Sequence, residues 1–155
     1  MFGRKKRRER QLADRLAGDA PHDRLFAAIH EGAQAVIDGD AVTSYGWPNL
    51  SMNEQRAALI EYCETMAKML SVDQSAIRVF FDQTMDAAIP RSKAVAIELT
   101  EDRIAAAERA IEEIEAASES VAVWNDDPNA GSLRAAGATV YLPDDLLDGF
   151  LDLST

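Results

Sequence analysis

Apolar positions in the first half of the chain recur at helical spacing in three successive segments. In residues 22–38 they are Leu25, Phe26, Ile29, Ala33, Val36 and Ile37, and similar stripes run through residues 52–70 and 73–89. Apolar side chains three or four positions apart lie on one face of a helix, and Pro90 ends the third stripe because helices usually stop before proline. The pattern predicts three amphipathic helices that close an N-terminal bundle over about residues 22–89.

The segment between the first two stripes, residues 39–50, has two glycines, a proline and two aromatic residues. This composition predicts an ordered loop. Tyr45 and Trp47 have two interpretations: they cover one end of a helical core, or they form a partner-binding spot, since both residue types are enriched at interface hot spots. Ser51 and Glu54 then form a capping box, which marks the start of the next helix.

Beyond Pro90 the pattern changes to short alternating runs separated by helical stripes. The predicted order is a strand at 94–99, a helix at 101–118, a strand at 121–124, a short helix at 132–136 and a strand at 138–142. For the first of these strands, a helical continuation is the open alternative. The last connector is long enough for a parallel crossover. The sequence thus predicts an α+β fold, predominantly α, in which the bundle is followed by a small strand-helix-strand-helix-strand layer over about residues 94–142.

Length and composition are those of one ordinary domain. The 155 residues are 47% hydrophobic, which is enough to fill a core. We therefore expect a basic, flexible N-terminal arm at residues 1–20 and a single globular domain at residues 21–155. The helical half of that domain is predicted at residues 21–90 and the α/β half at residues 91–155.

Composition also excludes several classes of protein. No run approaches the roughly 18 apolar residues that cross a bilayer, and no apolar segment follows the basic N-terminus as it does in a signal peptide. We therefore expect a cytoplasmic protein. Cys63 is the single cysteine, so an internal disulfide is excluded and a cysteine-based zinc cluster is not expected. No cofactor is predicted.

The formal net charge of −11 conceals two opposite regions. Residues 1–24 carry eight cations and four anions, which leaves a net charge of +4 there and −15 on residues 25–155. The densest basic run comprises Arg4, Lys5, Lys6, Arg7, Arg8 and Arg10. Such a run is either a solvated tail or an arm that binds nucleic acid or an acidic protein. We expect other protein subunits as partners and retain nucleic acid as an alternative partner of the arm, while the oligomeric state is left open.

One set of residues has the composition of a metal site. If the last two strands are parallel neighbours, Asp126 and Asp127 follow one strand end and Asp144 and Asp145 follow the next. Ligand sites in open α/β sheets lie at that edge, and Mg²⁺ prefers carboxylate oxygens. Paired aspartates beside proline are also common turn and helix-cap residues. The chain has no phosphate-binding loop, no Gly-x-Ser-x-Gly and no His-Glu-x-x-His motif.

The conspicuous features of the sequence are interaction features. We therefore expect a non-enzymatic interaction protein, an adaptor or structural subunit of a larger assembly, which binds partners through its basic arm and the acidic surfaces of its body. One alternative is a nucleic-acid-binding regulator that acts through the arm, and another is a Mg²⁺-dependent enzyme that uses the four aspartates. The charge of the body also suits an inhibitor that mimics nucleic acid.

Overall fold

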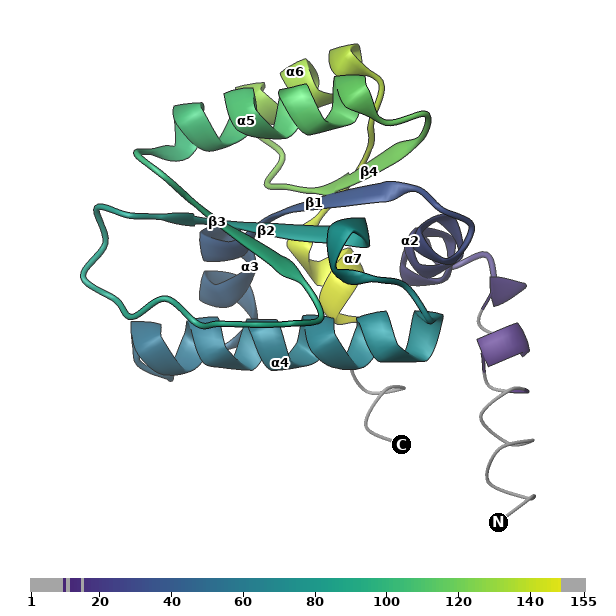
Figure 1. Ribbon diagram of the computed structural model, residues 1–155, viewed down its shortest axis with the longest axis horizontal. Coiled ribbons are helices and arrows are strands. Elements are labelled where there is room, and N and C mark those ends of the chain that lie inside the picture. Colours follow the sequence, from purple (N-terminus) through teal and green to yellow (C-terminus); the bar gives the residue numbers. More distant parts are fainter. Residues whose placement is uncertain (1–9, 11, 15, 149–155) are drawn as a thin grey trace.

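A five-stranded parallel sheet forms the centre of the protein (Figure 1). The computed structural model describes residues 10, 12–14 and 16–148. In chain order the strands are β1 (Gln34–Asp38), β2 (Ile77–Asp82), β3 (Ala96–Thr100), β4 (Ser120–Val123) and β5 (Thr139–Tyr141). Across the sheet their order is β3-β2-β1-β4-β5, and each pair of neighbours is parallel. The chain therefore builds outward from β1 to β3 and then returns to the other side of β1 for β4 and β5.

Helices cover both faces of the sheet. One face carries α5 (Arg103–Ala116) and α6 (Pro128–Ala136), and the other carries α2 (Pro21–His30), α3 (Gly39–Gly46), α4 (Met52–Leu70) and α7 (Pro143–Leu147). A short 3-10 turn, η1 (Gln74–Ala76), leads into β2. Phe80 and Trp124 belong to the core under α5 and α6, whereas Leu59, Met66 and Phe81 belong to the larger core on the opposite face. The fold is therefore a three-layer α/β sandwich.

The predicted three-helix bundle over residues 22–89 is wrong. The end of the first predicted helix forms β1, and the third predicted helix is replaced by η1, β2 and an irregular connector. In β1, Ala35 and Ile37 contact the larger core while Val36 contacts the smaller one. A strand buried on both faces reads as a continuous apolar run without polar alternation, and such a run also satisfies helical spacing. The predicted α+β, predominantly α class is thus corrected to α/β with a parallel sheet.

Several other predicted elements are confirmed. The second predicted helix is α4, and its capping box is present, with hydrogen bonds of 3.3 Å from the Glu54 amide to Ser51 Oγ and from the Ser51 amide to Glu54 Oε1. β3 confirms the strand predicted near residues 94–99, and α5 confirms the helix that follows. β4 and β5 are parallel neighbours joined through α6. The predicted loop at residues 39–50, by contrast, begins with the helix α3.

Within the predicted basic arm, residues 1–9, 11 and 15 lie outside the described residues. Leu12 and Leu16, which fall within the predicted arm, are half-buried and pack against the larger core. The division into a flexible arm and one globular domain stays a prediction. Within the described ranges, no helix is both long and apolar enough to cross a membrane.

Candidate functional site

Aspartates gather at the carboxyl-terminal edge of the sheet. Asp38 is the last residue of β1, Asp82 is the last residue of β2, Asp40 lies in the first turn of α3, and Asp127 follows β4. Because the strands are parallel, these four positions share one edge (Figure 1). We name Asp38, Asp40, Asp82 and Asp127 the acidic edge. It spans the gap between β1 and β4, where the strand order reverses, and open α/β sheets bind ligands at that position.

A glycine lets α3 begin directly against β2. A Cβ atom at Gly39 would lie 2.5 Å from Phe81 Cε1 and 2.7 Å from the Phe80 carbonyl oxygen, so a larger residue does not fit without displacement of its neighbours. Asp38 caps the helix, and its Oδ1 accepts a 3.4 Å hydrogen bond from the Ala41 amide. The turn therefore packs the start of α3, with Asp38 as its cap, against the end of β2.

Asp38 is a buried carboxylate with a half-exposed cationic partner. Asp38 is 5% exposed, whereas the side chain of Arg103 is 50% exposed. Arg103 Nη2 donates a 3.2 Å hydrogen bond to Asp38 Oδ2 and lies 3.9 Å from Asp127 Oδ2. Desolvation raises the pKa of Asp38 above its ordinary value, and the ion pair with Arg103 opposes that shift. Buried acids with shifted pKa values are enriched at functional sites.

Arg56 organises the other half of the acidic edge. Its side chain comes from α4 and is 1% exposed. Nη2 donates to Asp40 Oδ1 at 3.1 Å and to the Asp82 carbonyl oxygen at 3.0 Å, and Nη1 donates to the Ala87 carbonyl oxygen at 3.5 Å. The guanidinium carbon lies 4.7 Å from the centroid of the Phe81 ring. Since Asp40 Oδ2 also accepts a 2.6 Å hydrogen bond from the Asp82 amide, Arg56 and Asp40 together tie α4, α3 and β2 into one unit.

The acidic edge has the donor chemistry of a divalent-metal site without the assembled geometry. Carboxylate oxygens are the ligands that Mg²⁺ prefers. Over the part of the chain that the structure describes, however, no three His, Cys, Asp or Glu side chains are grouped closely enough to hold a metal ion. Arg56 and Arg103 pair with the carboxylates of Asp40 and Asp38 instead. The carboxylates therefore suit a divalent ion in their chemistry. Their positions, however, are set by ion pairs with the two arginines.

The Arg56 side chain also contains a buried nitrogen atom whose hydrogen-bonding capacity is unused in the described structure. Arg56 Nε is buried and, within the described residues, has no hydrogen-bond partner. Its guanidinium group contacts Asp40, so this donor belongs to the acidic edge. A buried polar atom without a partner is unusual in a folded protein, and a bound water or ligand is one way to satisfy it.

Of the four aspartates predicted as metal ligands, Asp127 lies at the acidic edge. It caps α6 through Oδ1, while its Oδ2 faces Arg103. Asp126 is exposed beside it. Asp144 and Asp145 lie in the first turn of α7, where Asp145 Oδ2 accepts a 2.9 Å hydrogen bond from the Leu142 amide. Asp127 and Asp145 thus have the capping role that the sequence also indicated.

The predicted partner-binding residues are placed as follows. Trp47 is half-buried and packs against the larger core, whereas Tyr45 is 58% exposed. Arg10 is exposed, and Arg4, Lys5, Lys6, Arg7 and Arg8 lie outside the described residues. Partner binding by the loop and by the arm stays a prediction.

Sequence reasoning missed Asp38, Asp40 and Asp82. The hydrophobic pattern places the first at the end of a helix, the second in a loop and the third in the interior of another helix. The available signal was an apolar run that ends in aspartate, since Asp38 and Asp82 each follow three apolar residues in succession. Runs of this kind are typical of central parallel strands, and the residues that follow them face the ligand-binding edge.

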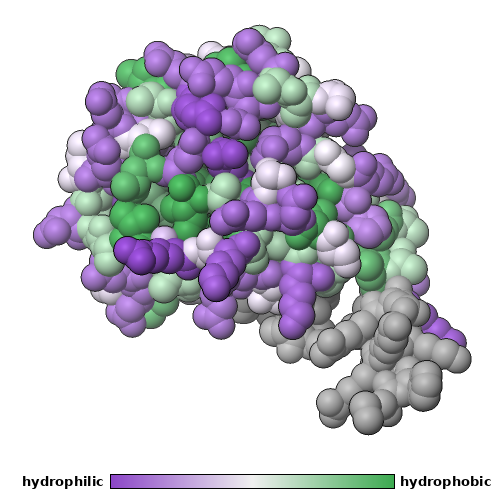
Figure 2. All heavy atoms as spheres, viewed as in Figure 1, coloured by the Kyte–Doolittle hydropathy of each residue, from purple (hydrophilic) through white to green (hydrophobic). Residues whose placement is uncertain are grey.

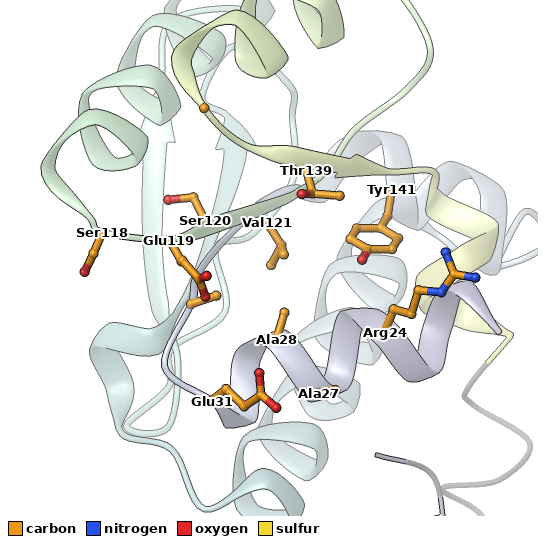
Figure 3. Close-up of a pocket in the computed structure, with 12 residues that line it drawn as sticks. Arg24, Ala27, Ala28, Glu31, Ser118, Glu119, Ser120, Val121, Thr139 and Tyr141 are labelled. Carbon is orange, nitrogen blue, oxygen red and sulfur yellow. The ribbon is translucent and has the colours of Figure 1, made fainter. Parts of the chain in front are cut away.

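Two hollows of the described structure lie away from the acidic edge. One, of about 450 Å³, is bounded by α2, β4 and β5 and is lined in part by Arg24, Glu31 and Tyr141 (Figure 3). Burial raises the pKa of Tyr141, and Arg24 opposes the shift. The other, of about 600 Å³, runs beside β3 and includes the exposed Ile89 and Leu99. Figure 2 shows apolar side chains on this part of the surface, beside β3 and the connector that precedes it. Neither lining includes a residue of the acidic edge.

Known proteins resemble this chain in fold. No protein-family model and no curated protein matches it. Among solved structures, Rae1 (YacP) from Bacillus subtilis is similar with a TM-score of 0.65 and 19% sequence identity, over 78% of this chain and 75% of that one. A mutant of the same protein gives a TM-score of 0.64 at 19% identity, over 79% of this chain and 77% of that one. At this level of identity, the likeness shows that the chain shares the fold of Rae1 (YacP), and it shows the fold alone.

Proposed function

We propose that the protein is a divalent-metal-dependent phosphodiesterase that acts on nucleic acid, with the acidic edge as its active site. The observation that carries the proposal is the Asp38 carboxylate, 5% exposed at the end of the central strand. Burial of a carboxylate disfavours folding unless a cation compensates it. A buried aspartate at the ligand-binding edge of a parallel sheet therefore indicates a residue kept for function.

The placement of the other carboxylates supports this assignment. β2, β1 and β4 are adjacent in the sheet, so Asp82, Asp38 and Asp127 lie at three neighbouring strand ends, although within the described residues their carboxylates are not grouped as metal ligands. Each of the three has one oxygen, Oδ2, that accepts no backbone hydrogen bond in the described structure. These are the oxygens that would hold a divalent ion. Both oxygens of Asp40 are already engaged by Arg56 and by the Asp82 amide, which makes Asp40 a positioning residue.

The chemistry follows from this donor set. A divalent cation at such a site would neutralise charge at a phosphoryl group and activate a water nucleophile. Asp38, Asp82 and Asp127 would hold and orient this ion. Arg56 keeps Asp40 and the end of β2 in place because its own side chain is buried and fixed by several acceptors. Arg103 is half-exposed at the same edge and provides positive charge for a phosphate.

The distribution of charge indicates the class of substrate. Residues 25–155 carry a net charge of −15, which repels a polyanion, whereas residues 1–24 carry +4. A basic arm attached to an acidic catalytic body suits a polymer of phosphates, because the polymer can contact the arm and the site at the same time. The proposal thus unites the two alternatives from the sequence, nucleic-acid binding and Mg²⁺-dependent catalysis, and moves the catalysis to the acidic edge.

The adaptor role expected from the sequence stays a prediction, as does the cytoplasmic location. The opposite charges of the arm and the body favour it as a second candidate function. A pull-down from host extract with and without residues 1–10 tests it. Protein partners that depend on those residues would support the adaptor role.

Hydrolysis of labelled oligonucleotides tests the proposed function. The full chain is incubated with Mg²⁺ or Mn²⁺ and with single-stranded and duplex RNA and DNA, beside the variants Asp38→Asn and Glu108→Gln. Asparagine keeps the capping oxygen of residue 38 and removes its charge. Glu108 is exposed on α5 and belongs to the outer face of the helix, so Glu108→Gln removes one carboxylate away from the acidic edge.

We expect metal-dependent cleavage by the wild type and by Glu108→Gln. Asp38→Asn should lower the rate by roughly 10²-fold or more, the usual effect of removing one electrostatic group from an active site. Circular dichroism spectra and melting curves recorded in EDTA establish that the variant is folded. Absence of cleavage of all four substrates with either metal, or equal rates for wild type and Asp38→Asn, would refute the proposal.

A further inference from the structure

We propose that Arg103 is an internal counter-ion that holds the place of a divalent cation between Asp38 and Asp127, and that metal binding requires this side chain to leave. The inference rests on the proposed function, because it concerns how the same site takes up its metal. It also accounts for the observation that carboxylates of suitable chemistry are not assembled into a metal site among the described residues.

The contacts of Arg103 place one positive group against two carboxylates. Nη2 lies 3.2 Å from Asp38 Oδ2 and 3.9 Å from Asp127 Oδ2. The two oxygens are therefore at most roughly 7 Å apart, a gap that Mg²⁺ can span with one direct ligand at about 2.1 Å and one ligand held through a retained water. These carboxylates follow β1 and β4, the two strands between which the strand order reverses. The guanidinium group thus occupies the position where the sheet is expected to bind a ligand.

Arg103 differs from Arg56 in how firmly it is held. Arg56 is 1% exposed and donates to three acceptors while it stacks on Phe81. Arg103 is 50% exposed and has one hydrogen bond within the described structure, the one to Asp38. Moving Arg103 into solvent therefore disrupts one hydrogen bond and the 3.9 Å ion pair with Asp127. Arg56 is part of the fold, whereas Arg103 can exchange with another cation.

Departure of Arg103 leaves the local backbone supported. The start of α5 is capped by Asp102, whose Oδ1 accepts a 2.8 Å hydrogen bond from the Ala105 amide. Asp38 and Asp127 cap α3 and α6 through their Oδ1 atoms, while the oxygens that face Arg103 are both Oδ2. The same carboxylates can therefore exchange a guanidinium group for a metal ion without losing the hydrogen bonds that hold three helix starts.

The burial of Asp38 explains why an exchange is favoured over an open site. A carboxylate that is 5% exposed needs a nearby cation, and Arg103 provides one when metal is absent. A divalent ion provides it when metal is present. Because both cations compete for the same oxygens, Arg103 lowers the apparent affinity for metal, and its removal should raise that affinity.

Binding of Mn²⁺ alone tests this competition without reference to activity. Calorimetry or electron paramagnetic resonance on the full chain compares the wild type with Arg103→Gln, Arg103→Lys, Arg134→Gln and Asp38→Asn. Arg134 is exposed near the end of α6, so Arg134→Gln removes the same charge from the protein at a distance from the two carboxylates. Lysine at residue 103 restores a positive charge that can compete.

We expect Arg103→Gln to bind Mn²⁺ more tightly than the wild type by roughly fivefold, the upper end of what a partly exposed ion pair contributes. Arg134→Gln and Arg103→Lys should bind like the wild type, and Asp38→Asn should bind more weakly than the wild type. Equal or weaker binding by Arg103→Gln than by Arg134→Gln overturns the role of Arg103 and leaves the proposed function intact. Absence of Mn²⁺ binding in every variant overturns both.

Discussion

Replacing Gly39 with alanine perturbs the contact that brings α3 to the end of β2. The new Cβ atom would lie 2.5 Å from Phe81 Cε1 and 2.7 Å from the Phe80 carbonyl oxygen, where ordinary contact begins at 3.4 Å. Neither neighbour can move freely. The carbonyl belongs to the backbone of a central strand, and the Phe81 ring is 1% exposed and stacked against the Arg56 guanidinium group. The clash must therefore be relieved by a shift of α3 or of β2.

Overpacking of this kind costs about 1–3 kcal/mol. At roughly 2–4 °C per kcal/mol for a chain of this size, the melting temperature should fall by roughly 2–12 °C. Since the acidic edge is built on the same turn, we also expect Gly39→Ala to lower any metal-dependent activity. The free energy of unfolding is measured by urea denaturation, with circular dichroism and tryptophan fluorescence as independent signals.

Gly131 provides the matched control. It lies inside α6, a Cβ atom added there would have no neighbour within 4 Å, and its backbone is not left-handed. Gly131→Ala should therefore raise the free energy of unfolding by about 0.5–1 kcal/mol, because alanine is the better helix former. The two substitutions add the same methyl group, but they should change the free energy of unfolding in opposite directions. A Gly39→Ala variant that is as stable as the wild type would refute the packing argument.

A further substitution and a labelling reaction probe the buried polar groups. Arg56→Met removes the partner of Asp40 and the donor to the Asp82 and Ala87 carbonyl oxygens. Urea denaturation should therefore show that the free energy of unfolding falls by about 3–5 kcal/mol. A fall below about 1 kcal/mol, the range of an exposed ion pair, would contradict a structural role for Arg56. Burial, with a smaller contribution from Glu64, raises the pKa of Cys63 to about 12. The thiol should therefore stay unreactive toward a disulfide reagent at a pH of about 8 and become labelled in step with unfolding as urea is added, whereas rapid labelling of the native protein would show that Cys63 is accessible.

The two long helices could be predicted from sequence because each has one polar face. α4 and α5 each have solvent on one side, so their apolar residues recur at helical spacing, and the Ser51 capping box marks where α4 begins. β1 and β2 have helices on both sides and lie at the centre of the sheet. Their residues are apolar without alternation, and nothing local separates them from buried helical segments. The pairing partners that make them strands are distant in sequence.

The same difference decided which site residues could be found. Asp127 follows β4, a strand that the sequence predicts, and it was identified together with the parallel pairing of β4 and β5. Asp38 and Asp82 end the two strands whose apolar pattern predicts helices, so the sequence could not predict that they share one edge of a sheet. The roles of Arg56 and Arg103 depend on contacts with residues 16 to 65 positions away, and such contacts exist only after the sheet has formed. Candidate sites on central strands therefore require the topology first.

Under the proposed function, the basic arm would capture the nucleic acid and the acidic body would carry out the chemistry. Residues 25–155 contain eight cations, and in the described structure Arg56, Arg78, Arg103 and Arg109 are paired with carboxylates. A phosphate polymer that approaches the acidic edge therefore meets carboxylates before it meets available cations, and a divalent ion must neutralise them before a phosphate can come close. If the six cations of the basic run each contact a phosphate, binding should weaken with salt at a log–log slope of about −5. Under the proposed function, the arm would then determine how tightly nucleic acid is held, and the acidic edge, once metal has replaced Arg103, would determine whether it is cleaved.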